Sequence, residues 1–125
     1  MGKPQFEQTA VLSGPITVAP QSFTTVGTLV SGNGIGAGTD LFGAPFTAPG
    51  TGSIVIWGSF TGTNAVLQYQ VGSGPWQALN GPAGALVAGE AWAFSIPVLA
   101  GDVVTFSTNV NTTSGGIEAA FSQKQ

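Results

Sequence analysis

The side chains that could carry out chemistry are few, because the chain contains no histidine and no cysteine. General acid–base catalysis needs titratable groups within reach of one another, and a serine nucleophile would lack its usual base here. A carboxylate pair of the glycosidase type is the remaining scheme. Its candidates are Asp40, Glu90, Asp102 and Glu118. Acids beside turns mostly accept hydrogen bonds from local backbone N–H groups, so we predict that the protein is not an enzyme.

The same shortage argues against a bound metal or cofactor. Zinc prefers histidine and cysteine ligands, which are missing. Calcium could use Asp40 or Asp102 with backbone carbonyls, but the sequence has no Asp-x-Asp-x-Asp spacing. We therefore predict no metal, no cofactor and no small-molecule substrate.

The three tryptophans are the next candidates for binding. Trp57 lies in an apolar run and is predicted to belong to the core. Trp76 and Trp92 have two interpretations. They pack in the core or between subunits, where aromatic residues anchor interfaces, or they stack on a sugar ring beside Gln77 and Asn80.

Charge is scarce along the whole chain. Only 6% of residues are charged, whereas an ordinary domain carries about a quarter. Soluble monomers usually have well-charged surfaces, so we expect much of this surface to contact a partner. Two lysines cannot neutralise a row of phosphates, which excludes nucleic acid as that partner.

Membrane attachment is also not expected. The N-terminal residues lack the apolar run of a signal peptide. No stretch reaches the roughly 20 apolar residues of a membrane-spanning helix. We expect a protein that is made in the cytoplasm of its host.

The elements that must position these residues are short strands. The 125 residues suit one domain, and 20 glycines and 8 prolines spread along the chain divide it into short runs. Helical periodicity is nearly absent, and residues 82–90 form a loop or a single turn at best. Residues 31–39 are predicted to be a mobile surface loop. The predicted strands are 8–12, 16–18, 21–30, 41–46, 53–60, 65–71, 75–79, 92–97, 103–110 and 117–122, with turns at 72–74, 100–102 and 111–116.

This pattern predicts an all-β fold, an antiparallel β-sandwich with about eight to ten short strands. We expect an N-terminal arm at residues 1–8 and a single sandwich domain at residues 9–125.

The C-terminal third resembles a known family. Residues 94–106, with the turn Leu99-Ala100-Gly101-Asp102, and residues 116–122 resemble the last strands of the jelly-roll domains related to tumour necrosis factor and C1q. The resemblance implies a jelly-roll-like sandwich that assembles as a homotrimer. The chain is also similar to the head decoration (cement) proteins of bacteriophages, which include small β domains that are rich in Gly and Thr and lack Cys. This similarity implies a virion protein on the outer capsid surface, with the major capsid protein as its partner.

Two segments are predicted to contact the capsid or a neighbouring subunit, the arm and the glycine-rich loop. Two alternatives stay open. One is a receptor- or carbohydrate-binding module at a phage fibre tip, and the other is an extracellular fibre subunit joined by donated strands, for which the polar residues 3–8 are a poor donor. The candidate interface residues are Lys3, Pro4, Gln5, Phe6, Glu7, Asn33 and Ile35.

Overall fold

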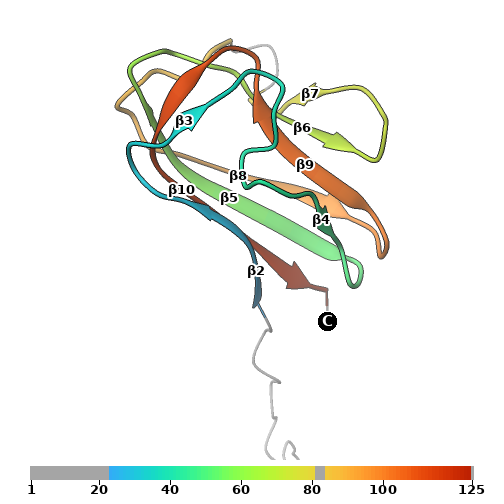
Figure 1. The fold of residues 1–125 in the computed structure, drawn as a ribbon. Coiled ribbons are helices and arrows are strands. Elements are labelled where there is room, and N and C mark those ends of the chain that lie inside the picture. The colour runs from blue at the N-terminus through green and yellow to red at the C-terminus, as the bar shows by residue number, and fades with distance from the viewer. Residues whose placement is uncertain (1–22, 81–83, 125) are drawn as a thin grey trace, which may run out of the picture.

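A computed structural model describes residues 23–80 and 84–124 of the chain. Within these residues the protein is an antiparallel β-sandwich without a helix, which confirms the predicted all-β fold class. Figure 1 shows the strands in two layers. The predicted arm at 1–8 and the predicted strands at 8–12 and 16–18 lie outside the described residues.

Each layer is one sheet. The five-stranded sheet has the order β2 (Phe23–Leu29), β10 (Thr112–Gln123), β5 (Gly52–Thr61) and β8 (Trp92–Val98), and the short β3 (Gly34–Ile35) also pairs with β10. The four-stranded sheet has the order β4 (Phe46–Thr47), β9 (Val103–Thr108), β6 (Leu67–Val71) and β7 (Gln77–Ala78).

The strand pairs are nested along the chain. With β3 set aside, the first described strand pairs with the last, β2 with β10, and the next pairs inward are β4 with β9, β5 with β8 and β6 with β7. The start of β2 therefore lies beside the end of β10, close to the C-terminus in Figure 1. The chain is in effect one long antiparallel hairpin that is folded over into two sheets.

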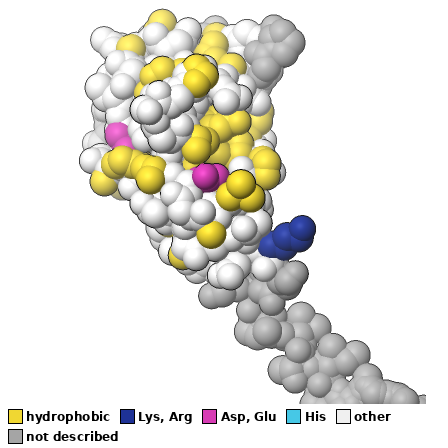
Figure 2. All heavy atoms as spheres, turned by 90° about the vertical axis from the view of Figure 1, so that its right-hand side faces the viewer, with side chains coloured by type: hydrophobic (Ala, Val, Ile, Leu, Met, Phe, Trp, Pro, Cys, Tyr) yellow, Lys and Arg dark blue, Asp and Glu magenta, His cyan; other side chains and the backbone are white. Residues whose placement is uncertain are grey.

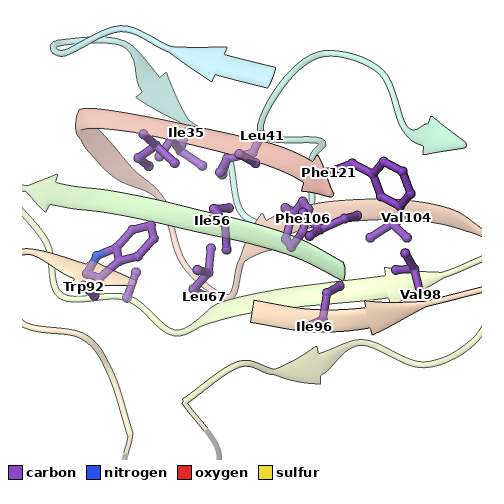
Figure 3. Packing of buried hydrophobic residues seen from close by; sticks show 14 of the residues in the cluster. Ile35, Leu41, Ile56, Leu67, Trp92, Ile96, Val98, Val104, Phe106 and Phe121 are labelled. Atoms are coloured by element: carbon purple, nitrogen blue, oxygen red, sulfur yellow. The ribbon is translucent and has the colours of Figure 1, made fainter. Parts of the chain in front are cut away.

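The core fills the space between the sheets because side chains alternate between the two faces of each strand. Ile54, Ile56 and Phe60 of β5 are fully buried. Figure 3 shows Ile56 in the same cluster as residues of the four-stranded sheet, among them Leu67 and Phe106. Fully burying an aliphatic or phenylalanine side chain stabilises the fold by roughly 1.5–3 kcal/mol.

A β-bulge interrupts the pairing of β10 with β5. The register shifts between Ser114 and Ile117, and Gly116 has a φ of 105°. A bulge places an extra residue in one strand and changes which face the following side chains occupy. The prediction of a turn at 111–116 is therefore wrong, because β10 begins at Thr112 and its glycines form the bulge.

The glycine-rich segment 31–39 is held in place by strand pairing and hydrogen bonds. Ile35 pairs with Thr112 in β3 and is only 5% exposed, so its side chain belongs to the core. The backbone N–H of Gly38 donates to the carbonyl of Thr108 at 2.9 Å, and that of Ala37 donates to Oδ1 of Asn111 at 2.8 Å. The interpretation of this segment as a surface loop holds for most of its residues, which are exposed, but not for Ile35, which is buried in the core.

Candidate functional site

The strand register places one set of side chains on the side of the five-stranded sheet that faces away from the core. On this side Trp57 of β5 lies opposite Glu118 of β10, and Val55 lies opposite Ala120. Glu118 is the only charged residue among the side chains that the register assigns to this side. We call this side of the sheet the outer face, and it consists of Phe23, Thr25, Thr28, Ser53, Val55, Trp57, Ala93, Ser95, Pro97, Glu118, Ala120 and Ser122. Of these residues Ser122 is buried, at 9% exposure.

A groove lies at one end of the outer face, around the Trp57–Glu118 pair. Its volume is about 370 Å³, and Thr28, Leu29 and Val30 also line it. Trp57 is 39% exposed, and Val30 is 60% exposed. The prediction that Trp57 belongs to the core is wrong, because the buried positions of β5 are Ile54, Ile56 and Phe60.

A second hollow lies at the other end of the same sheet. Its volume is about 440 Å³, and its lining includes Pro97, Leu99, Asp102 and Lys124. Leu99 is 65% exposed. Because Lys3 lies outside the described residues, Lys124 is the only cationic side chain within them. The molecular surface in Figure 2 shows hydrophobic patches among uncharged atoms, with few charged groups.

Two of the carboxylates accept hydrogen bonds from backbone N–H groups nearby in the chain. Oδ1 of Asp40 accepts the N–H of Phe42 at 2.8 Å. Oδ2 of Asp102 accepts the N–H of Leu99 at 2.8 Å, in the turn that joins β8 to β9. The prediction that these two acids hydrogen-bond local backbone N–H groups is confirmed. Glu90 is exposed in a turn of its own, where its N–H donates to the carbonyl of Val87.

Among residues 23–80 and 84–124, no group of three or more His, Cys, Asp or Glu side chains is placed to hold a metal ion. Across the same two ranges, no helix has the length and apolar character needed to cross a bilayer.

Trp92 is part of the core. It is 9% exposed and packs between Phe60, at a ring-centroid distance of 5.2 Å, and Phe94, at 6.0 Å. Neighbouring rings therefore occupy the faces on which a sugar would stack, so of its two interpretations core packing is the right one and ligand stacking is wrong. Trp76 is half-buried beside β7, and its neighbour Gln77 accepts a hydrogen bond from the Tyr69 hydroxyl at 3.4 Å.

The structure divides the predicted interface residues into three groups. Residues 3–7 lie outside the described part of the chain. Asn33 is exposed, as an interface residue must be. Ile35 is a core residue, so its assignment to an interface is wrong. The outer face could not be recognised in the sequence because the run at 53–60 is apolar on both sides. The signal that could have identified it is strict alternation, which places Val55 and Trp57 outward once Ile54 is known to be buried.

Fold and surface together define a class of protein, a two-sheet antiparallel β-sandwich that exposes a nearly uncharged sheet face. Neither protein-family models, nor curated proteins, nor solved structures give a match to the chain.

Proposed function

We propose that the protein is a structural capsid decoration (cement) protein, which binds the outer surface of a bacteriophage capsid as a homotrimer and stabilises the shell. The observation that carries this proposal is the outer face. It exposes Trp57 at 39% and Phe23 at 66%, with Glu118 as its one charged side chain. Exposed apolar surface of this kind marks interaction sites in soluble proteins.

The strand order supports a jelly roll as the form of the sandwich. A jelly roll has eight strands in two sheets with Greek-key connections. Nested pairing of the first strand with the last, and so on inward to β6 with β7, is what a rolled-up hairpin of eight strands gives. The turn at residues 99–102 joins β8 to β9, as the resemblance to the tumour necrosis factor and C1q domains requires.

The scarcity of charge suits a protein that acts through contact area. Burying an ion costs several kcal/mol unless it is paired well, and a chain with 6% charged residues avoids most of that cost. A stable interface buries about 800 Å² on each partner. A trimer that makes such contacts with adjacent capsid subunits adds interactions that must break before the shell opens. The major capsid protein is thus the proposed partner, and the outer surface of the virion is the proposed location.

Sedimentation with expanded, empty heads of the phage that encodes the chain tests this function. We expect the protein to pellet with the heads to saturation, in multiples of three copies per binding site, and to raise the temperature at which the heads open. A protein that binds the assembled shell, but not its separated subunits, stabilises the shell by mass action. Protein that stays in the supernatant at micromolar concentration, with the opening temperature unchanged, contradicts the proposal.

A further inference from the structure

The outward side of β10 carries opposite charges at its two ends. Glu118, Ala120 and Ser122 face outward by alternation, and the N–H of Lys124 donates to the carbonyl of Thr51 at 2.8 Å, which continues the strand pairing past Gln123. Lys124 therefore follows Ser122 on the same side of the sheet, and it lines the hollow that contains the outward residue Pro97.

These two charges cannot meet within one chain. They lie six positions apart along the extended chain, which is about 20 Å at 3.3 Å per residue. An ion pair needs its nitrogen and oxygen within about 4 Å. Among residues 23–80 and 84–124 Lys124 is the only cation, so in this part of one chain no cation is within reach of Glu118, and a second copy of the chain offers a complement to both charges.

We propose that copies of the chain dock head to tail, with Lys124 of one copy entering the Trp57–Glu118 groove of the next. This inference rests on the proposed homotrimer and names the contact that joins its subunits. Of the two charges, Glu118 lies in an apolar groove beside an exposed indole. Lys124 lies beside Leu99, which is 65% exposed and is flanked by Pro97.

The groove has the chemistry that a lysine side chain requires. The apolar stem of a lysine packs along hydrophobic surface while its ammonium group stays at a polar site. An ammonium group over an indole is attracted by the ring, and the carboxylate of Glu118 lies opposite Trp57 in the strand register. Around this pair, Leu99 of one copy would cover Val30 of the next, since both are exposed apolar side chains.

Asp102 also lines the hollow around Lys124. Its Oδ2 is held by the N–H of Leu99 within the turn, at 2.8 Å. The carboxylate is thus fixed to its own loop, whereas the long side chain of Lys124 extends from an exposed position. Lys124 is therefore the group at this end that reaches toward a neighbouring copy.

The symmetry of the contact follows from its two unlike halves. The groove and the Lys124 end are different surfaces, so the contact is heterologous, and such contacts close into a ring or continue as a filament. Docking like end to like end would place Glu118 against Glu118, which is repulsive at this short range. In a closed ring of three copies, each Trp57–Glu118 groove holds Lys124 of the neighbouring copy, and no groove or lysine is left without its complement.

Reversal of the two charges tests the contact. We expect Glu118→Lys and Lys124→Glu each to weaken trimer formation at least tenfold, and the double variant E118K/K124E to recover most of the wild-type affinity, as measured by sedimentation equilibrium. Glu90→Lys is the matched control, because Glu90 is an exposed acid that is not among the residues of the outer face, and it should leave the trimer unchanged. Circular dichroism confirms that each variant is folded.

The outcomes separate this contact from the proposed function. Single variants that remain trimers, or a double variant that stays dissociated, overturn the Lys124–Glu118 contact while leaving a trimeric cement protein intact. A wild-type dimer overturns the head-to-tail arrangement, because it indicates reciprocal pairing about a two-fold axis. Trimers that behave as proposed here but never pellet with heads overturn the capsid function alone.

Discussion

Replacing Gly58 by alanine is expected to lower the free energy of unfolding by about 3 kcal/mol or more, from combined backbone strain and overpacking. Gly58 has a φ of 152°, which side-chain-bearing residues rarely adopt. A Cβ atom there would overlap the carbonyl oxygen of Gly116 and lie 2.8 Å from Cα of Ile117. The backbone of β10 at its bulge would have to move, and a backbone cannot yield as a flexible side chain does.

Gly34→Ala is the matched control in the same sheet. A Cβ atom at Gly34 meets nothing within 4 Å, and no positive φ is found there. We expect its effect on the free energy of unfolding to stay within about 1 kcal/mol, the usual cost or gain of such an exchange. Urea unfolding followed by circular dichroism compares the two variants. Equal midpoints for Gly58→Ala and the wild type would show that the bulge is not needed to position β10.

The bulge matters for the site because it sets the face of every later side chain in β10. Beyond it, Ile117 pairs with Gly58 and turns inward, where it is 1% exposed. Glu118 then turns outward, opposite Trp57. A shift of one residue would exchange the two faces and place the carboxylate in the core.

Replacing Val55 by lysine is expected to raise the dissociation constant of the proposed trimer at least a hundredfold while the domain stays folded. Val55 lies in the middle of the outer face, between Ala120 of β10 and Ser95 of β8. In the assembled state its side chain would be covered, and covering an unpaired ammonium group costs several kcal/mol. Each 1.4 kcal/mol changes the association constant about tenfold. Sedimentation equilibrium measures the change.

Val103→Lys is the control for this substitution. Val103 is 38% exposed and adjoins the buried Val104 in β9, so it faces outward from the four-stranded sheet. The same exchange of side chains there should leave the trimer intact. If Val103→Lys dissociates the trimer and Val55→Lys does not, the wrong sheet has been assigned to the interface.

Strands with strong alternation could be predicted from the sequence. The run at 92–97, predicted to be a strand, becomes β8 and places Trp92 and Ile96 on one buried face. The run at 53–60 becomes β5, but β-branched residues on both of its sides hid which face is the core. Trp57 was misplaced for this reason, since an exposed tryptophan and a buried one look alike in an apolar run.

Two other errors came from glycine. Glycine favours turns and also supplies the positive φ of a bulge, so residues 111–116 suggested a turn where the structure has the bulge of β10. The glycine-rich segment 31–39 suggested a loop, although Ile35 within it is buried through a two-residue pairing with β10. Local patterns cannot report such long-range pairs, and the nested order of the whole sandwich depends on them.

The mass of the wild-type protein in solution tests the central claim most directly. Light scattering during size-exclusion chromatography should give three times the 12.4 kDa of one chain, with no change on dilution through the low micromolar range. That result is expected if other copies cover the outer face, whose one charged residue in the strand register is Glu118. A single 12.4-kDa species that stays monodisperse at millimolar concentration would contradict the account, because its outer face would then need no partner.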